Sequence, residues 1–200
     1  MVNTYILYDE TNECIIIDPA CVEESEQKQL SDFFVNNKLK LTRNINTHCH
    51  IDHVLGHDFI ASNYGIFPEY HEASNLFFMP LREIAADFGY RIDRIPSAKG
   101  YLHDGDIIKF GNSELKVLYT PGHADGSVSF YQKDQRFVIT GDVLFRESIG
   151  RTDLPTGNYN ILMKSIKEKL FTLPDDVVVY PGHGPETTIG YEKVNNPFIQ

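Results

Sequence analysis

The sequence is poor in positive charge. Its 200 residues carry 18 Lys and Arg against 28 Asp and Glu, a formal net charge of −10 with histidine neutral. A nucleic-acid surface needs clustered basic side chains. No basic run is present, so we expect no nucleic-acid partner. Bound divalent cations would cancel part of the negative charge, although a solubilising acidic surface accounts for most of it.

Long apolar stretches and a leader-like N-terminus are also missing. No apolar run approaches the roughly 20 residues that a membrane span needs, and residues 1–5 show no basic segment before an apolar one. The three cysteines, Cys14, Cys21 and Cys49, lack metal-finger spacing. We therefore expect free thiols, a cytoplasmic location and no membrane partner. The oligomeric state leaves no signal in the sequence.

Linkers, tandem repeats and low-complexity segments are absent as well. A chain of 200 residues with 42% hydrophobic residues is long enough to bury a substantial core. We expect a single domain over residues 1–200.

Apolar spacing and turn residues predict the order of the elements. Two strands around residues 9–12 form an antiparallel hairpin, and the second strand stops at Asp18-Pro19. Strands, helices, strands, a helix and a strand in this order fit two mostly antiparallel or mixed sheets with helices outside. The predicted strands are 3–9, 13–18, 41–46, 107–110, 115–119, 127–131, 137–140 and 177–180, and the predicted helices are 22–37, 54–63, 71–90 and 159–171.

Residues 47–53 read Thr-His-Cys-His-Ile-Asp-His and hold the densest chemistry of the chain. Neutral imidazole and carboxylate are ligands that divalent transition metals prefer. Such groups are unfavourable to bury together without a partner. The cluster therefore predicts a metal site, with hydrolytic or redox chemistry as its use.

Three further ligand-type side chains follow predicted strands. His123 and His183 each come after a strand and a Pro-Gly turn, and Asp142 follows residues 137–140 and Gly141. A turn at a strand end fixes the backbone and places the side chain at the sheet edge. If these ends lie on one edge, the side chains converge with residues 47–53.

Residues 47–53 and the three strand-end residues together offer seven ligand-type side chains. One tetrahedral ion binds only four ligands. Two ions about 3.5 Å apart that share one carboxylate would use all seven. We expect His48, His50 and His123 to hold one ion, and Asp52, His53 and His183 to hold the other, with Asp142 between them.

The arrangement resembles the metallo-β-lactamase superfamily. The motifs are residues 47–53, Pro121-Gly122-His123, Gly141-Asp142 and Gly182-His183, in an order that matches from residue 3 to residue 183. Residues 141–153 resemble those of the glyoxalase II-like hydrolases, and residues 181–190 those of their short bacterial members. The resemblance implies an αββα sandwich with the site at the edge of the sheets and the ligand sets given above. We expect no counterpart of the further C-terminal helical domain of full-length glyoxalase II.

This resemblance implies a metal-dependent hydrolase that cleaves thioesters of the hydroxyacyl-glutathione type through a metal-bridging hydroxide. It implies two divalent ions, zinc first and iron or manganese as alternatives, and a small thioester or other anionic substrate. Asp52 would orient the nucleophile or take up its proton. Arg151 stands where the resembling hydrolases carry a basic residue that meets an anionic substrate; a solvated loop arginine is the competing interpretation.

A second enzyme class shares much of this pattern. Persulfide dioxygenases use one iron held by two histidines and one carboxylate, which here would be His48, His123 and Asp142. A metal-stabilised binding module is the third interpretation, but structural zinc sites favour cysteine and close every position.

Structural roles can account for the remaining residues of metal-binding type. Cys49 alternates with its neighbours on an extended segment, so we expect a small buried thiol rather than a ligand. Asp18 either supports a ligand histidine through its ring N–H or only ends a strand. We interpret His57, His71 and His103 as surface or structural.

Overall fold

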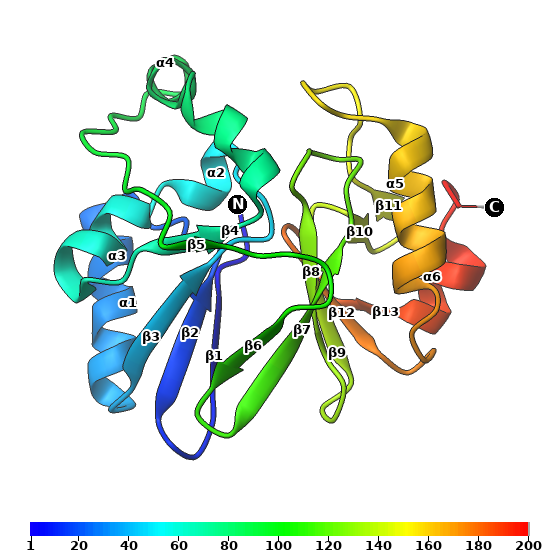
Figure 1. Cartoon of the computed structure of the whole chain (residues 1–200), viewed down its shortest axis with the longest axis horizontal. Helices are drawn as coiled ribbons and strands as arrows, with labels where there is room; N and C mark the ends of the chain where they lie inside the picture. The colour runs from blue at the N-terminus through cyan, green and yellow to red at the C-terminus, as the bar shows by residue number, and fades with distance from the viewer. Residues whose placement is uncertain (200) are drawn as a thin grey trace.

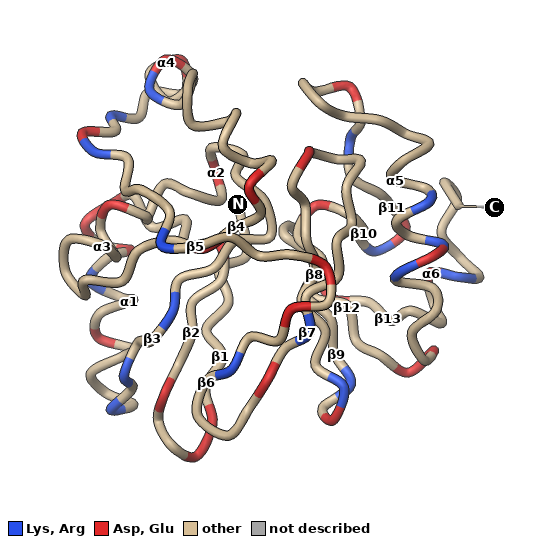
Figure 2. The backbone as a smooth tube through the Cα atoms, viewed as in Figure 1, with Lys and Arg blue, Asp and Glu red and all other residues tan. Residues whose placement is uncertain are grey.

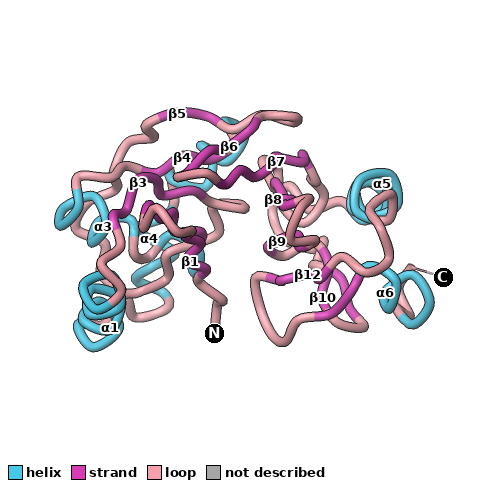
Figure 3. Tube along the Cα trace, turned by 90° about the horizontal axis from the view of Figure 1, so that it is seen from below, coloured by secondary structure: helices cyan, strands magenta, loops and turns pink. Residues whose placement is uncertain are grey.

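Two β-sheets lie against each other, and helices cover the outer face of each (Figures 1 and 3). The computed structural model describes residues 1–199. This is the expected αββα sandwich with mixed sheets.

The first sheet has the strand order β1-β2-β3-β4-β5. Its first pair is the predicted antiparallel hairpin, in which Tyr5 lies opposite Ile17. The other neighbouring strands pair in parallel. The strands are β1 (Tyr5–Tyr8), β2 (Glu13–Ile17), β3 (Lys40–Ile45), β4 (Pro68–Tyr70) and β5 (Gly100–Tyr101).

The second sheet has the order β13-β12-β9-β8-β7-β6. Only β12 and β9 pair in parallel, and the other neighbours are antiparallel. A separate two-stranded ribbon, β10 (Leu144–Phe145) and β11 (Ser148–Ile149), follows β9. The strands of the sheet are β6 (Ile107–Phe110), β7 (Ser113–Tyr119), β8 (Val128–Gln132), β9 (Phe137–Gly141), β12 (Val178–Pro181) and β13 (Thr187–Thr188).

Helices close both outer faces. In Figure 1, α1 and α3 lie beside sheet one, α2 and α4 lie above the strand ends, and α5 and α6 cover sheet two. They are α1 (Glu24–Asn36), α2 (Ile51–Val54), α3 (His57–Tyr64), the 3₁₀ helix η1 (Glu72–Phe78), α4 (Leu81–Asp87), α5 (Tyr159–Ser165), the π-helical η2 (Ile166–Leu170) and α6 (Ile189–Asn195).

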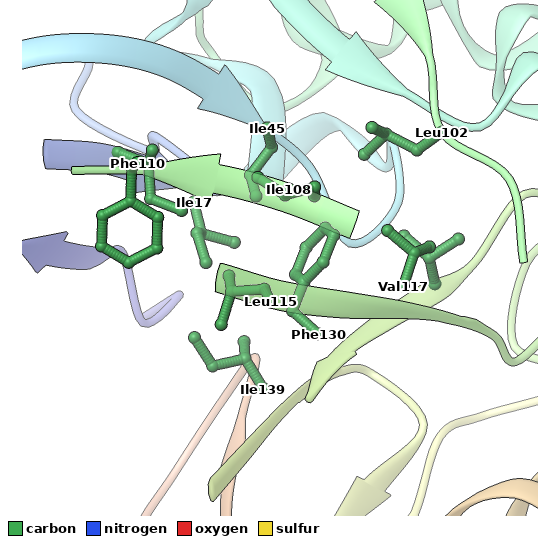
Figure 4. Packing of buried hydrophobic residues seen from close by; sticks show 11 residues of the cluster. Ile17, Ile45, Leu102, Ile108, Phe110, Leu115, Val117, Phe130 and Ile139 are labelled. Atoms are coloured by element: carbon green, nitrogen blue, oxygen red, sulfur yellow. The ribbon is translucent and has the colours of Figure 1, made fainter. Parts of the chain in front are cut away.

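The central core fills the space between the sheets. Ile17 and Ile45 come from sheet one, and Phe130 and Ile139 come from sheet two; all four are almost completely buried (Figure 4). Burial of such side chains contributes about 1.5–3 kcal/mol each, so this shared core fixes the sheets relative to each other.

Two predicted helices are interrupted. The stretch 71–90 is a 3₁₀ helix and a short α-helix, because Pro80 cannot continue the hydrogen-bond ladder of residues 72–78. The stretch 54–63 begins earlier, as α2, and restarts at His57 after Gly56. A Cβ at Gly56 would lie 2.8 Å from the Pro19 carbonyl oxygen.

The topology gathers the predicted ligand segments. Strands β7, β9 and β12 run in the same direction, so their carboxyl ends share one edge of sheet two. The end of β3 joins them, since the Thr47 carbonyl accepts a hydrogen bond of 2.8 Å from the Val128 N–H. Figure 2 shows Lys and Arg dispersed among Asp and Glu along both halves of the chain.

Candidate metal centre

All seven predicted ligands meet at this common edge. His48, His50 and His123 each offer one ligand atom within 4.8 Å of the others, and Asp52, His53 and His183 do the same. These are the two triads that the spacing of the sequence predicts.

Asp142 lies between the triads. Its Oδ2 is 3.7 Å from Nε2 of His123 and 3.5 Å from Nε2 of His183. Its Oδ1 is 3.5 Å from Nε2 of His53. One carboxylate therefore faces histidines of both triads, as a shared ligand of two ions would.

A hydroxyl, a carboxylate and two backbone carbonyls fix the ring orientation of four histidines. The Nδ1 atoms of His48, His53, His123 and His183 lie 2.8–3.1 Å from an oxygen of Thr47, Asp18, Arg151 and Met1, respectively. An occupied Nδ1 leaves Nε2 free to face the centre. The fifth ring differs, because Nδ1 of His50 points at Nε2 of His123 at 2.9 Å.

Close packing beside the ligands requires glycine. A Cβ on Gly182 would lie 2.2 Å from Oδ1 of Asp142 and 2.9 Å from Cε1 of His53. Real Cβ atoms do not approach other atoms so closely, so Gly182 allows the loop with His183 to pack onto the other ligands.

The buried polar atoms of the centre lack protein partners. Nε2 of His48, Nε2 of His53 and Oδ1 of Asp142 are buried, and they form no hydrogen bond with any group of residues 1–199. Such atoms are unfavourable unless something else satisfies them. A donor set of imidazole and carboxylate without thiolate suits zinc, iron or manganese. The side chains therefore fit divalent metal.

Burial keeps the first triad neutral. It lowers the pKa of His48 well below 6.5, that of His50 to about 4, and that of His123 in the same direction. A neutral ring is the form that binds metal, so this triad needs little deprotonation at neutral pH.

In the second triad, neighbouring charges set the protonation states. Burial alone would raise the pKa of Asp52, but the His183 ring at 3.2 Å and His53 lower it to about 2. Burial alone would lower the pKa of His53, but Asp18 and Asp142 raise it to about 10. Without an ion, these carboxylates hold a proton on His53, which metal would displace.

Asp18 supports the second triad, as one of the two interpretations of the sequence predicted. Its carboxylate also accepts hydrogen bonds from the Thr47 N–H and hydroxyl, at 2.8 and 2.6 Å. Asn46 extends the network, since its amide donates to the carbonyl of His53 and its Oδ1 accepts from Nε2 of His57 at 2.7 Å. His57 is therefore structural and buried, and Asn46 is a supporting residue that the motif search missed.

Cys49 takes no part in the centre. It is fully buried among Val54, Tyr70 and Phe77, and burial raises the pKa of its thiol well above 9.0. The expected small buried thiol is confirmed. His71 and His103 belong to neither triad, and their ring centroids lie 6.0 Å from each other.

A hollow of about 540 Å³ opens beside the centre. His123, Asp142 and His183 line it together with Arg146 and Arg151. The Arg151 guanidinium binds both oxygens of Asp153 at 2.8 Å. Arg146 lies over the ring of Tyr191, 5.6 Å from its centroid.

None of the helices within residues 1–199 is long and apolar enough to cross a membrane.

The chain is similar to known proteins over most of its length. The family model of the metallo-beta-lactamase superfamily matches residues 1–183. The chain is 35% identical to the hydroxyacylglutathione hydrolase GloC of Haemophilus influenzae over 199 residues, which cover 98% of this chain and 92% of that protein.

Two solved structures are similar over nearly the whole chain. The BLEG-1 B3 metallo-beta-lactamase has 33% identity and a TM-score of 0.89, with 99% of this chain and 94% of that chain covered. The protein TTHA1623 in a di-iron-bound form has 33% identity and a TM-score of 0.86, with 98% and 94% covered. The match over residues 1–183 and the 35% identity to a relative confirm the expected resemblance: the chain belongs to the metallo-beta-lactamase superfamily.

Proposed function

We propose that the protein is a dinuclear metal hydrolase that cleaves thioesters, of the hydroxyacyl-glutathione type. The observation that carries the proposal is the pair of ligand triads joined by Asp142. The similarity to a relative named hydroxyacylglutathione hydrolase supports the substrate class.

His48, His50 and His123 would hold one divalent ion, and Asp52, His53 and His183 the other, with Asp142 shared. Such ions supply a water nucleophile activated near neutral pH and positive charge for the substrate oxygen. Zinc is the first candidate, and the di-iron form of a similar structure supports iron as an alternative.

We propose that Asp52 orients the attacking water or accepts its proton. Its side chain is 45% exposed, so water can reach it. Its pKa of about 2 keeps it ionised, able to accept a hydrogen bond from the attacking water and to orient it. A thiolate leaves without protonation, so no separate general acid is required.

The two arginines would bind the anionic part of the substrate. Both line the hollow beside the centre, and a guanidinium pairs well with a carboxylate. Arg151 already binds Asp153, whereas Arg146 lies over the ring of Tyr191 and pairs with no carboxylate among residues 1–199. Arg146 is therefore the freer cation for a substrate carboxylate.

Metal analysis combined with an anaerobic assay tests the proposal. We expect about two divalent ions per chain in protein purified without chelators, and hydrolysis of S-lactoylglutathione that continues without oxygen. Chelation should abolish the activity, and added metal should restore it. Full activity in metal-free protein would contradict the mechanism.

The same experiment distinguishes the hydrolase from a persulfide dioxygenase. A persulfide dioxygenase would contain one iron per chain, held by His48, His123 and Asp142, and would consume oxygen with glutathione persulfide. That result, together with no thioester hydrolysis, would replace the hydrolase proposal.

A further inference from the structure

His183 is packed less tightly than the ligand histidines His53 and His123. Its side chain is 34% exposed, whereas those of His53 and His123 are 0% and 3% exposed. Glycine flanks it on both sides, and Gly184 has a φ of +75°. Each flanking glycine loses more backbone entropy on ordering than any other residue would, so an ordered loop is costly here. Something outside the loop must therefore hold it.

The N-terminal segment supplies these contacts, although it lies about 180 residues away in the sequence. Val2 pairs with His183 in an isolated antiparallel bridge. The Asn3 N–H donates to the Gly182 carbonyl at 2.7 Å. The Met1 carbonyl accepts from Nδ1 of His183 at 3.0 Å, which turns Nε2 toward Asp52.

The side chain of Asn3 binds both flanks of the ligand. Its Nδ2 donates to the carbonyl of Pro181 at 3.1 Å and to the carbonyl of Gly184 at 2.9 Å. Both amide hydrogens are thus used on the backbone before and after His183. The Tyr5 hydroxyl adds a third donor, at 2.6 Å from the Pro181 oxygen.

From these contacts we infer that Asn3 is a positioning residue for the second metal site. It holds the loop of His183 so that this ring meets Asp52 and His53. The first triad belongs to other segments, and no side-chain hydrogen bond joins Asn3 to His48, His50 or His123 among residues 1–199. Loss of the Asn3 amide should therefore weaken one site selectively.

This inference rests on the proposed two-metal site, and a metal-binding measurement separates the two. Apo protein is titrated with Zn²⁺ against a competing chelator for the wild type, Asn3→Ala, Asn3→Asp and Asn37→Ala. Asn37 is the matched control, because its amide donates to a single backbone carbonyl, that of Phe33, on an exposed helix end. Thermal unfolding of each apo protein reports whether the fold is intact.

We expect Asn3→Ala to raise the dissociation constant of the second ion about 10–100-fold, the range for lost outer-shell support. Asn3→Asp should do at least as much, since it replaces the donor with an oxygen facing two carbonyl oxygens. The first ion should bind within twofold of wild type in every variant, and Asn37→Ala should match wild type for both ions.

Three results would overturn the inference. Unchanged second-site binding in both Asn3 variants would remove the role of the amide. An equal loss at both sites would mean general loosening of the fold. If the wild type binds only one ion, the two-metal proposal fails first and the inference falls with it. If Asn3→Ala does not fold, Tyr5→Phe replaces it, with a smaller loss expected at the same site.

Discussion

Oδ2 of Asp18 lies 3.0 Å from Nδ1 of His53, and both side chains are buried. The carboxylate fixes the ring that faces the second triad and raises its basicity. Asp18 also has a φ of +52°, a left-handed conformation that Asp and Asn tolerate better than most residues. This pair therefore depends on both the charge and the backbone of Asp18.

Asp18→Asn keeps the size and the tolerated backbone but removes the negative charge. We expect second-site metal affinity and thioester turnover to fall about 10–100-fold. The Thr47 donors would also face an amide, which should lower the free energy of unfolding by about 1–3 kcal/mol. Chelator competition and urea unfolding measure the two effects. Wild-type affinity in this variant would show that the His53 ring needs no carboxylate.

Asp52→Asn tests the proposed catalytic carboxylate. We expect kcat for thioester hydrolysis to fall about 10²–10⁴-fold, the contribution of a positioned proton acceptor. The first triad contains no Asp52 atom, so binding of the first ion should persist. Steady-state kinetics at saturating metal give the result. A rise in KM alone, with kcat unchanged, would mean that Asp52 contributes to substrate binding and not to catalysis.

Arg151→Ala should raise KM for anionic thioesters more than for neutral ones. We expect a change of only a few fold, because the Arg151 guanidinium is exposed and already bound to Asp153. Arg146→Ala should have the larger effect on the same substrates, since Arg146 is not paired in this way.

The control for both arginines is Arg136→Ala. Arg136 pairs with Asp176 on the surface, and neither residue lines the hollow beside the centre. Its kinetics should equal those of the wild type with each substrate. Equal effects of Arg151→Ala and Arg146→Ala on charged and neutral thioesters would argue against anion recognition by either side chain.

His57 should make stability depend on pH. Burial lowers the pKa of its ring to about 3, against 6.5 for an exposed ring. The unfolded chain therefore binds a proton between pH 6.5 and 3 that the folded chain excludes. Stability from this ring is complete above pH 6.5 and decreases by about 1.4 kcal/mol per pH unit below it.

The comparison uses His57→Gln, whose amide can still reach Asn46 but does not titrate. Between pH 6.5 and 5 the wild type should lose about 2 kcal/mol more than the variant in urea unfolding. Metal binding changes with pH in both proteins, so the difference isolates His57. Parallel pH profiles would mean that the folded protein accommodates the charged ring.

Gly182→Ala should damage the centre without touching a ligand. The added Cβ would overlap Oδ1 of Asp142 and crowd His53, so we expect fewer bound ions per chain and little activity. Gly100→Ala is the control, because a Cβ there meets no atom within 4 Å. Elemental analysis of both variants is sufficient. Two ions in Gly182→Ala would mean that the loop can shift outward without loss of ligation.

The strand ends and the ligand segments could be predicted from the sequence because each has a local signal. A buried strand followed by Pro-Gly-His or Gly-Asp is visible in a few residues. The shared edge then follows from the strand directions. The same local signals misled the prediction of a single helix over 71–90, where apolar spacing continues across Pro80 although the backbone does not.

The supporting residues could not be predicted, because their partners are distant in the sequence. Asn3 meets residues 181–184 only after both sheets are assembled. Asn46 and His57 likewise bind through side chains that carry no motif. Short elements such as β5 and β13 have too few residues for a pattern, and their pairing partners define them.

The proposed ligands come from both sheets: His48 to His53 follow β3, and the others follow β7, β9 and β12. Metal ions at this site would bind the folded chain and not the unfolded one. By mass action, the apparent free energy of unfolding then rises with the free metal concentration. Cells that limit the supply of this metal would thus regulate how long the protein survives, as well as how fast it works.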